Sequence, residues 1–171
     1  MSYDPTKHHR RSVRLKGYDY SQPGAYFVTI NTHLGQPLFG EITNGVIRLN
    51  ECGSLVEKEW LQTAAIRKNI ELDVFTIMPD HFHGILVILE DEEEKATQER
   101  AHIEAFGRST AGALPTIVRA FKSAVTRRIN QVRRGNAISV WHRGFYEHVI
   151  RNDEDLNRIT EYILGNPIKE L

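Results

Sequence analysis

The sequence predicts an α+β domain in which helices pack on a mainly antiparallel central sheet. Short runs rich in β-branched and aromatic residues are bounded by tight-turn signals, and three longer segments have helical periodicity. Apolar residues make up 40% of the 171 residues and charged residues 26%, which is typical of a globular domain with its own core. We therefore expect a single domain spanning residues 1–171.

The first elements are a strand, a hairpin and a helix. Residues 25–30 are rich in β-branched and aromatic residues and predict a strand. Residues 38–49 predict a hairpin that turns at Asn44-Gly45, because a tight primed turn needs the positive φ that these two residues tolerate. Asn50 is a suitable N-cap for a helix over residues 52–67, whose apolar positions, Ile66 among them, fall near one stripe.

Two apolar strands follow, over residues 72–77 and 81–89, and the turn Met78-Pro79-Asp80 joins them. Both are apolar on both faces, so we expect layers to cover the sheet on each side. The hairpin that they form should be central in the sheet. Residues 91–113 combine charge and small residues with little periodicity, which predicts an acidic mobile loop.

The last third of the chain predicts helix, strand and helix. A strong helix starts near Pro115, which suits a first helical turn, and stops at Gly135. A strand is expected within residues 137–150, and Asn152 caps the final helix. The stripe that should be buried in the first of these helices consists of Leu114, Ile117, Val118, Phe121, Val125, Ile129 and Val132.

Charge is strongly segregated although the net charge is zero. Residues 1–23 are basic and polar with interspersed tyrosines, and we expect them to form an arm outside the core. Residues 115–151 carry eight Lys and Arg residues against Glu147 alone. Two basic segments indicate a polyanion partner, although plain solvated faces are the alternative. The candidate contacts are Arg10, Arg11, Arg14, Lys16, Arg119, Lys122, Arg127 and Arg133.

Composition argues against several classes of protein. No run of about 18 apolar residues is present, so we expect no membrane span. The first residues lack the apolar segment of a secretory signal. Cys52 is the one cysteine, which excludes an internal disulfide and is typical of a reducing cytoplasm. We expect a cytoplasmic protein.

The tripeptide His81-Phe82-His83 opens one of the apolar strands. Residues two apart in a strand point to the same side, so both imidazoles share a face. Two imidazoles that converge at a strand end form half of a metal site. Two polar residues at the mouth of a hairpin are the alternative, and for an isolated His-x-His the commoner one.

Tyr162 and Asn166 lie one turn apart on a flank of the last predicted helix. A tyrosine there can pack on one side and present its hydroxyl to a cleft, although it is more often a packing residue. With the histidines, this spacing suits cleavage of a phosphodiester through a covalent link to tyrosine. Asn166 precedes Pro167, so we expect it at the helix terminus.

A divalent cation would neutralise the phosphate and stabilise the leaving oxygen. His81, His83 and the amide oxygen of Asn166 could hold it. Two imidazoles suit zinc or manganese better than magnesium, but a site open to solvent and phosphate can accept magnesium. We therefore expect Mg²⁺ or Mn²⁺.

Five motifs occur in the order typical of the single-tyrosine HUH transposases, and they most closely resemble the REP-associated tyrosine transposase branch. The motifs are residues 8–20, 78–84, 140–148, 151–156 and 162–167. The resemblance implies a ferredoxin-like or RRM-like HUH endonuclease fold. It implies that His81, His83 and Asn166 are metal ligands, and that Tyr162 attacks a phosphate of single-stranded DNA.

The same resemblance implies a covalent 5′-phosphotyrosine intermediate, a free 3′-hydroxyl and later strand transfer. It also implies that the basic arm and the basic helix recognise a DNA hairpin, which would make the protein nucleoid-associated. Both a monomer and a homodimer that exchanges the tyrosine helix are consistent with it.

Three alternatives stay open at this point. The chain could be a domesticated hairpin-binding protein without catalytic activity, or a metal phosphoesterase that uses His81 and His83 with water as nucleophile. Within the transposase hypothesis, Tyr146 is a rival nucleophile, although its motif position favours a structural or DNA-contacting role.

Replacing both Arg10 and Arg11 with Ala should weaken hairpin binding and make it less sensitive to salt. Each lost phosphate contact lowers the salt slope by about one unit, so a decrease of roughly one or two is expected. Fluorescence anisotropy titrations at several salt concentrations measure that slope. An unchanged slope would remove the arm from the interface.

Overall fold

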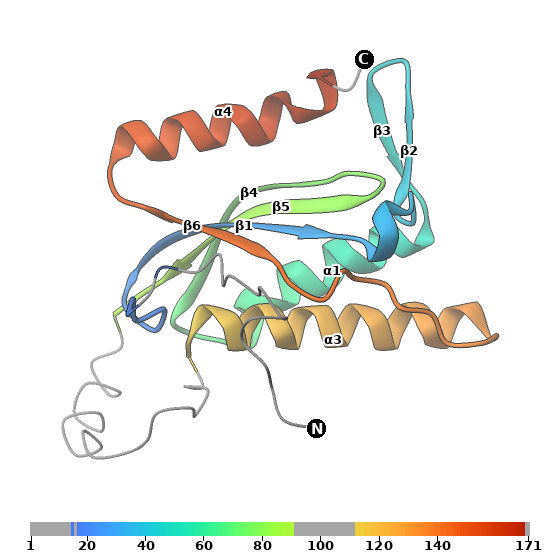
Figure 1. The fold of residues 1–171 in the computed structure, drawn as a ribbon, viewed down its shortest axis with the longest axis horizontal. Helices are drawn as coiled ribbons and strands as arrows, with labels where there is room; N and C mark the ends of the chain where they lie inside the picture. Colours follow the sequence, from blue (N-terminus) through green and yellow to red (C-terminus); the bar gives the residue numbers. More distant parts are fainter. Residues whose placement is uncertain (1–14, 16, 91–111, 170–171) are drawn as a thin grey trace, which may run out of the picture.

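A four-stranded antiparallel sheet between two helical layers forms the body of the chain (Figure 1). The computed structural model describes residues 15, 17–90 and 112–169. The strand order is β4-β5-β1-β6, and every neighbouring pair is antiparallel. The predicted α+β class is confirmed. The strands are β1 (Gly24–Asn31), β4 (Ile70–Ile77), β5 (His81–Ile88) and β6 (Tyr146–Ile150).

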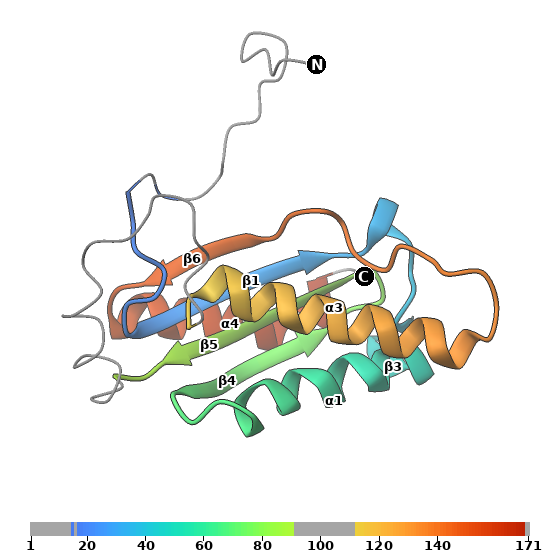
Figure 2. The same ribbon diagram turned by 90° about the horizontal axis from the view of Figure 1, so that it is seen from below.

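Helices cover both faces of this sheet, as the two-sided apolar strands predict. Helices α1 (Glu51–Ala65) and α3 (Leu114–Arg133) lie on one face, and α4 (Asp153–Lys169) lies on the other (Figures 1 and 2). Strands β2 (Gly40–Thr43) and β3 (Val46–Leu49) form a separate two-stranded sheet. In the described part of the chain, no helix is long and apolar enough to cross a membrane.

Local signals in the sequence determine where the elements start and turn. The β2–β3 turn has positive φ at Asn44 (53°) and Gly45 (74°), as a primed turn requires. Asn50 caps α1 by accepting a hydrogen bond from the backbone N–H of Gly53 at 3.0 Å. Asn152 caps α4 in the same way, accepting from the N–H of Asp155 at 2.8 Å.

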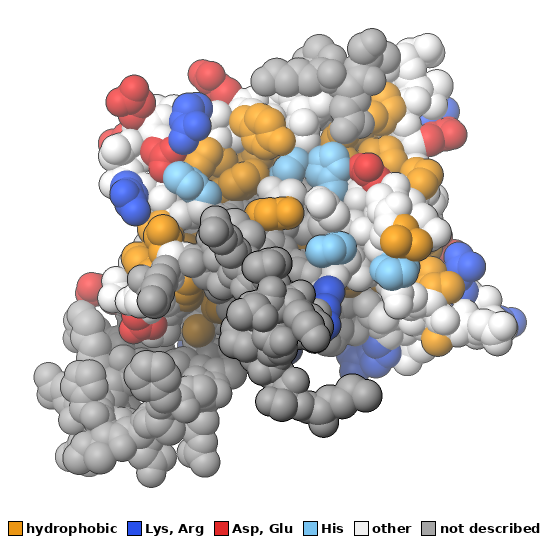
Figure 3. Space-filling view, in the orientation of Figure 1, with side chains coloured by type: hydrophobic (Ala, Val, Ile, Leu, Met, Phe, Trp, Pro, Cys, Tyr) orange, Lys and Arg blue, Asp and Glu red, His pale blue; other side chains and the backbone are white. Residues whose placement is uncertain are grey.

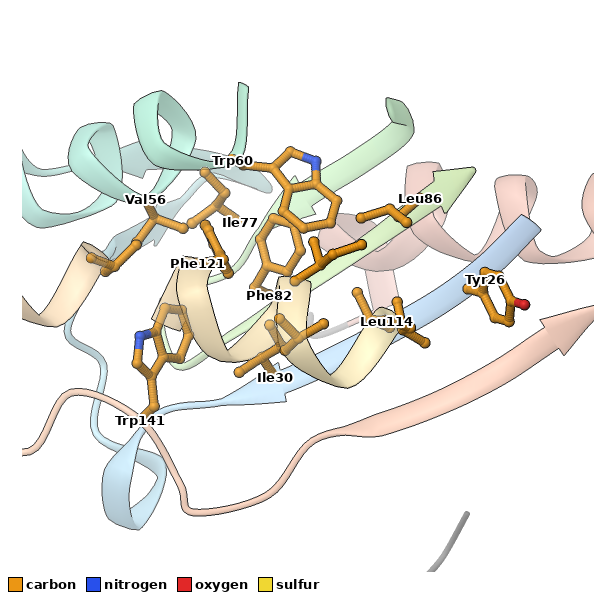
Figure 4. Packing of buried hydrophobic residues seen from close by; sticks show 14 of the residues in the cluster. Tyr26, Ile30, Val56, Trp60, Ile77, Phe82, Leu86, Leu114, Phe121 and Trp141 are labelled. Carbon is orange, nitrogen blue, oxygen red and sulfur yellow. The ribbon is translucent and has the colours of Figure 1, made fainter. Parts of the chain in front are cut away.

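The main core lies between the sheet and the layer of α1 and α3 (Figure 4). Trp60 of α1 is fully buried, and its ring centroid lies 4.7 Å from that of Phe82 on β5 and 5.2 Å from that of Phe121 on α3. Aromatic contacts at these separations add stability beyond the apolar area that they bury. This cluster therefore locks both helices to the central strands.

A smaller apolar cluster holds α4 against the opposite face. Ile159 and Ile163 of α4 pack on Ile85 of β5, with Phe27 and Leu156 at the margin. Ile85 and Ile163 are fully buried. Few buried side chains therefore attach α4, the helix that carries Tyr162, to the sheet.

Two expectations about burial and position are wrong. The β4–β5 hairpin is not central as a unit, because β4 lies at the edge and β1 pairs with the other side of β5. The pairing of β1 with β5 joins residues that are 50 (Asn31 with His81) to 64 (Gly24 with Ile88) positions apart, so no local sequence signal indicates it. Ile66 and Val132 are 63% and 41% exposed because each lies at the end of a helix, past the covered part of its stripe.

Two further expectations, about Tyr20 and Asn166, need correction. Tyr20 is 8% exposed and packs on the main core, with its ring centroid 6.2 Å from that of Tyr26, so this end of the predicted arm belongs to the core. Helix α4 continues through Asn166 and Pro167 to Lys169, so Asn166 is not at its terminus. A proline so near a helix end removes only one backbone hydrogen bond there, and the helix tolerates it.

Gly84 provides a test of the packing under the histidine strand. A Cβ at this position would lie 2.8 Å from the Phe82 ring and 2.9 Å from the Trp60 ring. We expect Gly84→Ala to lower the free energy of unfolding by about 1–3 kcal/mol, as overpacking does in other cores. Urea denaturation measures the change. Gly144→Ala is the control, because nothing lies within 4 Å of its Cβ position, and a similar loss in both variants would contradict this explanation.

Candidate active site

The pairing of β1 with β5 aligns the two candidate histidines on one face of the sheet. His81 lies opposite Asn31 and His83 lies opposite Thr29. The alternation of side chains directs both imidazoles toward the α4 side, while Phe82 enters the main core on the other side. The ring centroids of His81 and His83 are 4.6 Å apart. Histidine side chains gather across the middle of the face seen in Figure 3.

Helix α4 brings the other two candidate residues to the histidines. The Tyr162 hydroxyl lies 3.5 Å from Nε2 of His83, and the amide nitrogen of Asn166 lies 3.3 Å from Nε2 of His81. Tyr162 and Asn166 are one helical turn apart on α4, and His81 and His83 are two positions apart on β5, so each α4 residue meets one histidine. The structure thus brings all four side chains together within one chain.

Aromatic contacts orient the Tyr162 ring. Phe27 of β1 meets it edge-on at a centroid distance of 6.1 Å and stacks on His83 at 5.5 Å. The rings of His83 and Tyr162 also meet edge-on, at 5.3 Å. Tyr162 is 40% exposed, so one side of the ring is packed while the other is open to solvent.

The Nδ1 atom of each imidazole has a polar partner behind it. The Asp80 carboxylate lies 2.6 Å from Nδ1 of His81, and the Thr29 hydroxyl lies 2.8 Å from Nδ1 of His83. The Asp80 carboxylate accepts a hydrogen bond from Nδ1–H of His81, and the lone pair of His81 Nε2 is then directed at the cluster. A proton on Nδ1 of His83 likewise leaves a lone pair on its Nε2. Such outer partners fix the orientation of metal-binding histidines in known sites.

This donor set fits a divalent cation. The two Nε2 atoms converge on the side where Asn166 brings an amide, and a half-turn of that amide presents its oxygen instead of its nitrogen. Among the described residues, no group of three or more His, Cys, Asp and Glu side chains is arranged to hold a metal. A cation bound by the two histidines therefore needs the Asn166 amide, water or a substrate phosphate to complete its coordination.

Burial keeps His83 in the form that a ligand requires. The side chain is 4% exposed, and this burial, reinforced by the nearby His81, lowers the pKa of His83 to about 3 against an opposing effect of Asp80. The imidazole is thus neutral at physiological pH. Neutral imidazole is the state in which histidine binds metal ions.

The rival tyrosine, Tyr146, lies on the same face of the sheet. It occupies β6 opposite Thr29 and is 53% exposed. Thr29 in turn lies opposite His83, so one strand separates Tyr146 from the histidine strand. Tyr162 is the tyrosine with its hydroxyl at 3.5 Å from His83, and this favours it as the nucleophile.

Three of the candidate basic residues line one groove. Arg119, Lys122 and Arg127 of α3 face the segment 138–145 across a cavity of about 640 Å³, and Arg143 lines the same cavity. Arg133 stands apart, at the last turn of α3. Arg10, Arg11, Arg14 and Lys16 lie outside the described residues, as does most of the predicted acidic loop.

Lys122 has a structural task in this groove. Its ammonium donates to the backbone carbonyls of His142 at 2.8 Å and Gly144 at 2.9 Å. Burial lowers the pKa of Lys122. The side chain thus fastens the turn around Arg143 to α3, and any phosphate contact must share its ammonium with these two carbonyls.

Sequence reasoning missed the outer partners of the histidines. Asp80 directly precedes His81, so its proximity was readable from the sequence. Thr29 lies 54 residues from His83 and becomes visible only through the strand register. Phe27, which stacks on His83, likewise becomes visible only through the strand register.

Known proteins match the chain in sequence. No protein-family model matches it. An uncharacterized protein of Haemophilus influenzae (strain Rd) is 39% identical over 170 residues, which cover 97% of this chain and 92% of that protein. A second protein of the same organism, named "Putative REP-associated tyrosine transposase", is 33% identical over 93 residues. That match covers 54% of this chain and 47% of the relative.

A solved structure matches the fold. It is the structure of a REP-associated tyrosine transposase bound to a REP hairpin, with a TM-score of 0.62 and 19% sequence identity. The match covers 92% of this chain and 73% of the other. At this identity the similarity establishes a shared fold.

His83 should make the protein less stable in mild acid. Its folded-state pKa is lowered to about 3, so between about pH 6.5 and pH 3 the unfolded chain binds a proton that the folded chain does not. Stability therefore falls as the pH falls, by at most roughly 1.4 kcal/mol per pH unit. We expect His83→Gln to flatten this fall in urea titrations between pH 7 and pH 4.5.

His142→Gln controls for the loss of an imidazole, because this side chain is exposed and lies outside the cluster. Hydrogen bonds from His148 and Arg158 lower the pKa of Asp155. This also makes stability fall as the pH falls, but only below about pH 3.8. A wild-type slope in His83→Gln would show that His83 does not cause the loss.

Proposed function

We propose that this chain is a REP-associated tyrosine transposase and that it nicks and rejoins single-stranded DNA at a hairpin through a covalent bond to Tyr162. The family is supported by the motifs of the sequence, by the transposase relative and by the shared HUH fold. The observation that carries the catalytic part is the Tyr162 hydroxyl at 3.5 Å from His83, beside a second histidine and an amide.

The reaction would be a transesterification. The Tyr162 oxygen loses its proton and attacks the phosphorus, the new O–P bond forms, and the bond from phosphorus to the 3′-oxygen breaks. The electron pair of that bond stays on the 3′-oxygen, which takes up a proton. The 5′-phosphate is then linked to tyrosine, and attack by a 3′-hydroxyl on this link reverses the step and joins strands.

The residues around Tyr162 have separate tasks in this proposal. Phe27 and His83 hold the phenol ring, while its exposed side leaves a route for the proton to solvent. His81, His83 and Asn166 would hold Mg²⁺ or Mn²⁺. A bound divalent cation supplies charge neutralisation for the phosphate and for the leaving oxygen.

Hairpin binding is supported by two independent observations. The fold neighbour is a REP-associated tyrosine transposase bound to a REP hairpin. Arg119, Arg127 and Arg143 line a basic groove on this chain, and such groups track a phosphate backbone. We propose that DNA with hairpin structure is the partner.

A labelled hairpin oligonucleotide with single-stranded flanks tests the nucleophile. With manganese present, we expect a labelled protein band on denaturing gels that is lost in Tyr162→Phe, because this change removes only the attacking oxygen. Tyr146→Phe is the matched control and should keep the band. A band lost in Tyr146→Phe and kept in Tyr162→Phe would reverse the assignment.

Other outcomes identify the alternatives. Hairpin binding without any band in the unchanged protein would indicate an inactive binding protein. Nicking that survives in both tyrosine variants would indicate a phosphoesterase with water as nucleophile. His81→Ala should abolish the band and leave hairpin affinity nearly unchanged, whereas loss of both would make this histidine structural.

A further inference from the structure

A second cavity lies at the end of the histidine row farthest from Tyr162. It has a volume of about 570 Å³ and is lined by Asn31, His33, Asp80, His81 and Arg143, among others. Volumes of about 300–1,000 Å³ are typical of ligand sites, so a nucleotide fits. We refer to this space as the Arg143 pocket.

The residues of the site lie in a fixed order along strand β1. Phe27, Thr29 and Asn31 share the α4 face of β1, because every second residue does. Phe27 lies beside Tyr162, Thr29 lies behind His83, and Asn31 lies opposite His81 and lines the Arg143 pocket. The order along the strand is therefore Tyr162, His83, His81 and Arg143 pocket, over roughly 13 Å from Phe27 to Asn31.

The Arg143 pocket adjoins the basic groove. His142 and Arg143 line both cavities, so the turn that carries them is the shared wall. Lys122 holds this turn through the carbonyls on either side of Arg143. A strand that leaves the histidine row at His81 would therefore pass Arg143 and enter the groove beside Arg119 and Arg127.

Phosphoryl transfer by an attacking oxygen constrains which part of the strand this is. The attacking and leaving oxygens lie roughly in line on opposite sides of the phosphorus. With Tyr162 at one end of the histidine row, the leaving 3′-oxygen points toward the other end. That end opens into the Arg143 pocket.

We propose that the Arg143 pocket and the adjoining groove hold the single-stranded DNA on the 5′ side of the nick, the segment that leaves with the free 3′-hydroxyl. This inference rests on the proposed function. It adds the polarity of the bound strand and a residue, Arg143, that contacts the strand on its 5′ side. Arg143 binds a backbone phosphate of this segment through its guanidinium. Holding the released 3′-end beside the histidines keeps it available for rejoining.

The opposite cavity offers a matched control. It has a volume of about 600 Å³, is lined by Phe27, Arg158 and Tyr162, and lies at the tyrosine end of the row. Arg158 is exposed like Arg143 and pairs with the Asp155 carboxylate on its own helix, so replacement of either arginine by Ala removes one guanidinium from the surface. The two variants differ in the end of the row at which the charge is lost.

The experiment compares binding of trimmed hairpin oligonucleotides. The probe is a hairpin on which the Tyr162-dependent band forms and whose nick has been mapped, and all proteins carry Tyr162→Phe so that nothing is cleaved. Removing the nucleotides on the 5′ side of the nick should weaken binding on the order of tenfold, since one charged hydrogen bond is lost. In the background of Arg143→Ala the same trimming should cause little further loss.

Arg158→Ala should stay fully sensitive to trimming on the 5′ side. Full sensitivity of Arg143→Ala to trimming on the 5′ side would overturn the polarity, as would insensitivity of the parent protein to that trimming. So would a loss, in Arg143→Ala, of the sensitivity to trimming on the 3′ side. Thermal melting confirms that both variants are folded. Absence of a Tyr162-dependent band on every hairpin is a different failure, because it removes the proposed function itself.

Discussion

The antiparallel pairing of β1 with β5 is the constraint on which the site depends. This register sets Thr29 behind His83 and Asn31 opposite His81, and it turns both imidazoles toward α4. A slip of one residue would send the histidines into the main core, where Phe82 now packs against Trp60. The large aromatic cluster on the far face thus holds the register, and the polar chemistry occupies the face that the cluster leaves free.

Much of this could be read from the sequence, because the signals are local. The Asn44-Gly45 turn, the Asn50 and Asn152 caps, and the two-residue spacing of the histidines depend on nearest neighbours along the chain, and each is found as predicted. The gathering of Tyr162 and Asn166 with the histidines was accessible in a different way. It came from motif order rather than from physical contact.

Long-range features were out of reach for the same physical reason. Nothing around Thr29 indicates that a histidine 54 residues away would share its hydrogen bond. Lys122 looked like a free cation on a basic helix, yet a turn twenty residues later uses its ammonium. Nothing around Trp141 indicates that Phe39 and Phe121 would cover it. In each case the decisive neighbour is distant in the chain, so composition and periodicity carry no trace of it.

Helix α4 is held to the sheet by a small apolar cluster, and this affects how the site assembles. Ile85, Ile159 and Ile163 form its buried centre, whereas about twenty buried residues bind the other helical layer to the sheet. Tyr162 and Asn166 both lie on this helix. A small tilt of α4 would therefore move the phenol and the amide away from the histidines together. Undocking of this single helix would then separate Tyr162 and Asn166 from the histidines without disturbing the strands.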